Sequence, residues 1–151
     1  MKRVNQLLAL LLLTLPLSGI AQEIEIHDPY ARAVPPGQPN SAVFMRMVNS
    51  GSEPRALVRA TSSAAEVVEL HTHTLEGGMM RMREIARIEL PAGEEVRLEP
   101  GGLHIMLIGL APGFAPDSEV ELTLHFADGS EQTLTAPVRR LQMEMQGHHH
   151  H

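Results

Sequence analysis

Apolar and polar residues alternate with a period of two along most of the chain after residue 22, and clusters of Gly, Pro, Asn and Asp separate the runs. Such alternation is typical of half-buried β-strands. The clearest case is 119–126, where four apolar residues fall on one face and the polar residues on the other. The other runs of this kind are 23–26, 42–48, 55–60, 66–74, 79–83, 87–90, 95–98, 103–110 and 132–138.

Short strands at this close spacing, without a run of helical period, predict an all-β fold. We expect a Greek-key sandwich or barrel of eight to nine strands. The run 103–110 is the most apolar, so we place it in the centre of a sheet. No internal repeat and no second domain are evident, and the length fits one domain.

The first 21 residues have the organisation of an export signal. Lys2 and Arg3 precede a leucine-rich stretch, 7–17, and Gly19-Ile20-Ala21 supplies small residues at a cleavage spacing. We therefore expect a cleavable signal peptide, 1–21, and a periplasmic protein. The apolar stretch is too short to predict a membrane span. Because the sequence has no cysteine, we expect neither a lipoprotein type of signal nor a lipid anchor.

The expected domain follows as residues 22–138, and the strand pattern is lost from about 139. Residues 139–151 are expected to form a flexible His/Met-rich tail. The tail contains Met143, Met145 and His148 to His151. Whether the four histidines are native or a purification tag stays open, although a tag usually has six.

The charge balance and the absence of cysteine limit the partners and the metal ligands that this chain can have. The chain has 12 Lys and Arg against 18 Asp and Glu; without Lys2 and Arg3 the balance is 10 against 18, a formal net charge of −8. An acidic domain of this kind is a poor partner for nucleic acid, which needs a basic surface. The absence of cysteine excludes disulfides and thiolate metal ligands. A metal site in this chain must use His, Met and carboxylates.

Four residues are candidate metal ligands: His71, Met82, His104 and Met106. If Glu76-Gly77 is a two-residue hairpin turn, His71 faces Met82 across the hairpin, close enough for both to bind one ion. The same register places His73 opposite Met80; Gly78 leaves the register open.

His104 and Met106 project from one face of a single strand because they are two residues apart. If the fold brings the two His/Met pairs together, they form a pocket with two imidazoles and two thioethers. Local sequence does not establish that convergence.

The donor types favour copper(I). Thioether and neutral imidazole suit this soft ion, whereas zinc prefers carboxylate or thiolate with histidine and a blue-copper site needs a cysteine. Because imidazole must be deprotonated to bind, copper affinity is expected to fall below about pH 6.5.

The remaining His and Met residues receive weaker assignments. Met45 and Met47 are expected to fill the core, and His27 and His125 to lie at the surface. His73, Met79 and Met80 are plausible auxiliary ligands whose roles the sequence does not determine.

The spacing H-x10-M-x21-H-x-M, together with the segments VVELH, EGGMMRM and LPAGEEVRLEPGGLHIMLIGL, resembles the periplasmic copper(A) chaperone family, PCuAC. The resemblance covers about 24–138. It implies a cupredoxin-like β-sandwich that binds one copper(I) through the four candidate ligands. It also implies delivery of copper to the CuA site of cytochrome c oxidase subunit II, with a Sco-type thiol protein as a possible second partner.

Three functions remain in competition at this stage. The first is a copper(I) metallochaperone, and the second is a periplasmic copper-buffering or resistance protein with the same site but no dedicated recipient. The third is a structural or adhesion β-sandwich whose His and Met residues are incidental. An enzyme is the weakest hypothesis, because the sequence has neither a G-x-S-x-G elbow nor a cysteine nucleophile. Imidazoles in the tail would suit copper(II).

Overall fold

The computed structural model describes residues 24–141. Both the expected signal peptide and the His/Met residues of the tail lie outside the described residues, so those two predictions stay predictions. Residues 24–141 contain no helix and therefore none that is long and apolar enough to cross a membrane. The strands are β1 (Ile24–Arg32), β2 (Asn40–Asn49), β3 (Arg55–Thr61), β4 (Ala65–Glu76), β5 (Met79–Glu84), β6 (Ile88–Leu90), β7 (Glu95–Leu98), β8 (His104–Leu110), β9 (Glu119–Phe126) and β10 (Glu131–Arg139).

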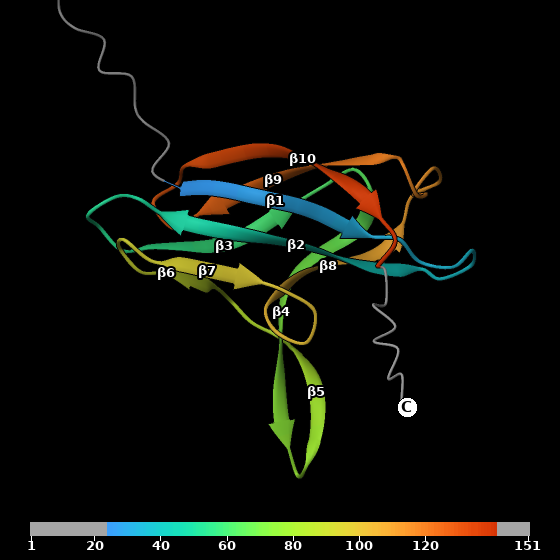
Figure 1. Ribbon diagram of the computed structural model, residues 1–151, viewed down its shortest axis with the longest axis horizontal. Coiled ribbons are helices and arrows are strands. Elements are labelled where there is room, and N and C mark those ends of the chain that lie inside the picture. The colour runs from blue at the N-terminus through green and yellow to red at the C-terminus, as the bar shows by residue number, and fades with distance from the viewer. Residues whose placement is uncertain (1–23, 142–151) are drawn as a thin grey trace, which may run out of the picture.

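The all-β prediction is confirmed, and every run that was expected to be a strand is one. The described part of the chain thus has ten strands rather than eight to nine. Their order is β5-β4-β8-β2-β1-β10-β9-β3-β6, with β7 pairing to β2 outside this path. The path folds into the two layers of a cupredoxin-like sandwich (Figure 1). All pairs are antiparallel except β1 with β10, where Ala31 lies opposite Val138.

The core follows the period-two pattern. The apolar face of β9 is buried, and Met45 and Met47 are 2% and 0% exposed, as expected for core methionines. Strand β8 lies between β4 and β2, which confirms its central place in the sheet. Its inward residues Ile105 and Leu107 are fully buried, and this leaves the alternate residues of β8 on the outer face.

Strand β1 is longer than the sequence predicted. The predicted run ends at residue 26, before Asp28-Pro29, but β1 continues through this pair to Arg32. A β-bulge lies between His27 and Tyr30, and Asp28 adopts a positive φ of 49°. A bulge leaves residues outside the ladder, so a proline that cannot donate a hydrogen bond is tolerated there.

The β4–β5 hairpin extends away from the body of the sandwich (Figure 1). The predicted Glu76-Gly77 turn is wrong: Glu76 pairs with Met79, and Gly77-Gly78 forms the two-residue turn. Gly77 and Gly78 have φ values of 58° and 81°. Two-residue hairpin turns of type I′ require positive φ at both central positions, so the glycine pair determines where the chain reverses.

Asn49 at the end of β2 links the two layers. Its side-chain amide donates to the carbonyl oxygens of Glu53 and Leu90, both at 2.8 Å, and its Oδ1 accepts from the backbone N–H of Gly51 at 3.0 Å. The residue is completely buried. Because Leu90 belongs to β6, and Gly51 and Glu53 to the loop between β2 and β3, this side chain joins the end of β2 to that loop and to a strand of the other layer.

Replacing Asn49 by Ala is expected to lower the free energy of unfolding by about 2–4 kcal/mol, since buried carbonyl groups lose their donors. Urea denaturation followed by circular dichroism measures this change. Thr135→Ala, at an exposed position on β10, serves as the control and should change stability by less than about 0.5 kcal/mol. Equal effects of the two substitutions would contradict a linking role for Asn49.

Candidate metal centre

Strand β4 is paired along both edges, and this brings all the candidate ligands to one place. On one edge His71 lies opposite His104, and Glu69 opposite Met106. On the other edge His73 lies opposite Met82. Because alternate residues share a face, all of these side chains project from the same outer side of the sheet. The convergence that local sequence could not establish is therefore present.

The three imidazoles form a cluster around His104. The ring of His104 lies 5.7 Å from that of His71 and 5.3 Å from that of His73, measured between centroids. The ring of Phe44 lies 6.2 Å away on the β2 side. With these neighbours His104 is only 2% exposed, although it projects from the outer face of the sheet.

Hydrogen bonds orient two of the imidazoles and leave one nitrogen of each available. Nε2 of His71 lies 2.7 Å from the Glu69 carboxylate, and Nδ1 of His104 donates to the Gly102 carbonyl at 2.9 Å. The other nitrogens, Nδ1 of His71 and Nε2 of His104, are buried and have no hydrogen-bond partner among the described residues. Buried polar atoms are nearly always paired. An imidazole that ligates a metal usually donates its second N–H to a carboxylate or carbonyl, which is the arrangement seen for both residues.

Burial lowers the pKa of the His104 imidazole below its usual value. The hydrogen bond to the Gly102 carbonyl opposes this shift, and the neighbouring His73 and His71 add to it. The neutral form of His104 is thus favoured, and a metal ion requires this form.

The methionine sulfurs complete a mixed donor set. Met82 is 41% exposed on the hairpin and Met106 is half-buried on β8. Both line a pocket of about 430 Å³ together with His104 and His73. The loop after β1, the start of β2 and the Pro100-Gly101 turn complete its wall. Within residues 24–141 no three His, Cys, Asp or Glu side chains are grouped to hold a metal ion.

The structure corrects the predicted register of the hairpin. His71 lies opposite Glu84 rather than Met82, and Met80 lies opposite Leu75 rather than His73. The pairing is shifted by two residues, so His71 and Met82 remain on the same face of the hairpin. They are diagonal neighbours, and such residues typically lie about 7–8 Å apart. The residue directly opposite Met82 is His73, which the sequence had ranked as auxiliary.

Sequence reasoning missed one residue of the site and misjudged a surface histidine. Glu69 was not singled out, although its place two residues before His71 puts it on the same face. His125 is not freely solvated: it contacts Arg59, Thr61 and Glu131, and its side chain is 15% exposed. His27 is exposed beside Glu25, as expected.

The other two proposed auxiliary ligands lie near the tip of the hairpin. Met79 and Met80 are 62% and 58% exposed. Met80 shares the face of Met82, and Met79 lies on the opposite face. Neither lines the pocket.

Comparisons with solved structures show the same fold. The "Copper-bound PCuAC domain from PmoF2" matches with a TM-score of 0.66 and 28% identity, covering 78% of this chain and 93% of that one. The "Solution structure of CuI-DR1885 from Deinococcus radiodurans" matches with a TM-score of 0.65 and 31% identity, covering 81% and 83%. The protein is thus similar to PCuAC domains over nearly their whole length.

A curated relative and a family model are both described by the words "Putative lipoprotein". The protein called "Putative lipoprotein Lxx21020" in Leifsonia xyli subsp. xyli is 34% identical over 120 residues, which are 79% of this chain and 71% of that protein. The model of the family described as "Putative lipoprotein LpqE-like" matches residues 24–138, which include all ten strands except Arg139, the last residue of β10. The chain belongs to the LpqE-like family.

Proposed function

We propose that this protein is a periplasmic metallochaperone that binds one copper(I) ion through His71, Met82, His104 and Met106. The observation that carries the proposal is the pair of buried nitrogens without a hydrogen-bond partner, Nδ1 of His71 and Nε2 of His104, on the sheet face where His104, Met82 and Met106 line one pocket. Copper as the cargo is supported by the similar PCuAC domains, two of which are described as copper-bound or CuI forms. An export route agrees with the name lipoprotein given to the relative and the family.

The donor set explains why copper(I) is preferred over other ions. Two thioethers and two neutral imidazoles bring no negative charge, and a soft monovalent ion tolerates this better than zinc does. Glu69 is hydrogen-bonded to Nε2 of His71, and the Gly102 carbonyl accepts from Nδ1 of His104. The other nitrogen of each ring is therefore left to bind the ion. His71 would therefore bind through Nδ1 and His104 through Nε2.

The position of Met82 supports release of the ion to another protein. Its side chain is 41% exposed on a hairpin that extends from the sandwich. An acceptor can therefore replace this thioether while the imidazoles still hold the ion. We propose the CuA site of cytochrome c oxidase subunit II as the recipient, with a Sco-type protein as a possible second partner. Holding and handing over an ion in this way is carrier chemistry rather than catalysis.

Anaerobic titration with copper(I) against a chromophoric chelator tests the site. In all samples Met143, Met145 and His148 to His151 are replaced by Ser, so that the tail, whose imidazoles would suit copper(II), contributes no ligand. We expect one tight equivalent in this background. The Met82→Ala, Met106→Ala double variant should bind about a thousandfold more weakly or worse, because the binding energy of a four-ligand site, of order 10 kcal/mol, is shared by its donors.

Met79→Ala is the matched control, because this methionine lies on the same hairpin but on the opposite face. It should bind like the parent. If the parent binds no copper(I) tightly, or if the double variant binds as well as the Met79 control, the four-donor site is refuted.

The burial of His104 makes the free energy of unfolding of the protein depend on pH. Because its pKa is lowered in the folded protein, the unfolded chain takes up a proton near pH 6.5 while the folded protein does not. The free energy of unfolding of the copper-free protein should therefore decrease as the pH falls below 6.5 towards the lowered pKa. Imidazole ¹⁵N NMR should give a titration midpoint for His104 below 6.5, and Phe44→Ala, which opens the ring to water, should raise it. A midpoint at or above 6.5 in the parent would contradict this.

Deletion of the gene tests the recipient. A dedicated chaperone predicts loss of cytochrome c oxidase activity that added copper restores. Sensitivity to copper with normal oxidase activity would instead support the alternative, a periplasmic buffering or resistance protein that uses the same site.

A further inference from the structure

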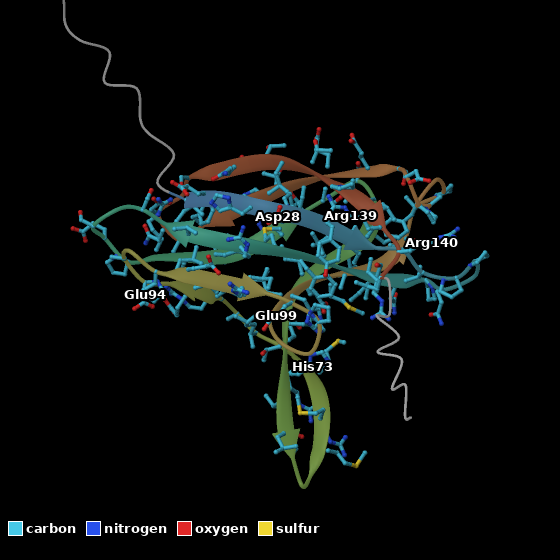
Figure 2. All side chains as sticks on the ribbon, viewed as in Figure 1. Asp28, His73, Glu94, Glu99, Arg139 and Arg140 are labelled. Atoms are coloured by element: carbon cyan, nitrogen blue, oxygen red, sulfur yellow. The ribbon has the colours of Figure 1, made fainter. Side chains whose placement is uncertain are left out.

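His73 occupies a place in the pocket that the four-residue motif does not account for. It lies directly opposite Met82, whereas His71 is only a diagonal neighbour of that sulfur. Of the described donor side chains, His73, Met82, His104 and Met106 line the pocket, and His71 does not. Figure 2 shows His73 where the hairpin leaves the body of the sandwich.

The two imidazoles of β4 are equally close to His104 but are held differently. Their ring centroids lie 5.7 Å (His71) and 5.3 Å (His73) from that of His104. His71 makes a short hydrogen bond of 2.7 Å with a carboxylate. His73 makes a long one, 3.4 Å from Nδ1 to the Gly102 carbonyl, and that carbonyl also accepts from His104. A weak bond to a shared acceptor restrains the ring of His73 less and leaves its Nε2 available for a ligand.

We propose that copper(I) has two overlapping positions in this pocket, an inner one completed by His71 and an outer one completed by His73. Both share His104, Met82 and Met106. The outer position is the one through which the ion enters and leaves. The proposal rests on the proposed function, because it assigns two stages to the same copper site.

The exchange between the positions is a simple ligand substitution. The bond from copper to Nδ1 of His71 breaks, a bond to Nε2 of His73 forms, and no electron or proton is transferred. Both imidazoles are neutral donors of the same type, so either can complete the site, and the support of His71 by the Glu69 carboxylate favours the inner position. The three shared donors hold the ion throughout the exchange. An acceptor then takes the ion from the outer position.

The test compares His73→Ala, His71→Ala and the double variant in the background with the substituted tail. His27→Ala is the control, because this histidine is exposed on β1, where it pairs with Glu25. Chelator competition gives the affinity for copper(I), and stopped-flow mixing with excess chelator gives the rate of transfer. Circular dichroism confirms that each variant is folded.

We expect His73→Ala to bind one equivalent with an affinity within about threefold of the parent, but to transfer copper about tenfold more slowly. His71→Ala should still bind one equivalent, about 10- to 100-fold more weakly, through His73. The double variant should be weaker again by at least about tenfold. In copper-loaded His71→Ala, imidazole ¹⁵N NMR should show Nε2 of His73 bound to the metal.

His73→Met distinguishes a ligand from a merely structural residue. A thioether at this position keeps a soft donor opposite Met82 and should restore most of the transfer rate lost in His73→Ala. The proposal is overturned if His71→Ala binds no better than the double variant, or if His73→Ala transfers copper as fast as the His27 control. These outcomes differ from failure of the proposed function, in which the parent itself would bind no copper(I) tightly.

Discussion

The double pairing of β4 is the constraint on which the site depends. One edge of β4 fixes His71 against His104, and the other fixes His73 against Met82. A slip of one residue on either edge would turn one set of side chains to the other face of the sheet. Two features limit such slips: the inward residue Leu70, which pairs with Ile105 in the core, and the glycine turn at the tip of the hairpin. Core packing and turn geometry thus position donors that lie outside the core.

The candidate site combines enclosed imidazoles with an exposed thioether. His104 is enclosed by Phe44 and by the other two histidines, and its orientation is fixed by a backbone carbonyl. Met82, in contrast, belongs to a strand in which every residue is exposed. A flexible, unbranched side chain in such a place can follow an ion over a short path. In the proposed copper(I) site, the rigid donors would reduce the ordering cost of binding, and the exposed donor would be the first that an acceptor replaces.

Much of the fold could be predicted because strand periodicity is local information. The apolar face of β9, the core methionines Met45 and Met47, and the central place of β8 all follow from residues within one run. The β4–β5 register could not be predicted, because Glu76-Gly77 and Gly77-Gly78 are both acceptable turns in the sequence. Only the backbone of the folded hairpin, with positive φ at both glycines, distinguishes them. The continuation of β1 through Asp28-Pro29 is a similar case, since a bulge overrides the usual meaning of a proline.

The donor residues of the candidate site could be chosen from the sequence, but the strand pairing that brings them together could not. The spacing of the two His/Met pairs indicates soft-metal chemistry, whereas the pairing of β4 with β8 is a long-range contact that no local pattern specifies. That pairing places His71 against His104 and Glu69 against Met106, whereas His73 meets Met82 through the separate pairing of β4 with β5. Glu69 holds the imidazole of His71 by a short hydrogen bond, and His73 presents a second imidazole in the lining of the pocket. In the two-position proposal, histidines two residues apart on one strand, one held by a short hydrogen bond and one by a long one, separate retention of the ion from its release on a single face of the β-sheet.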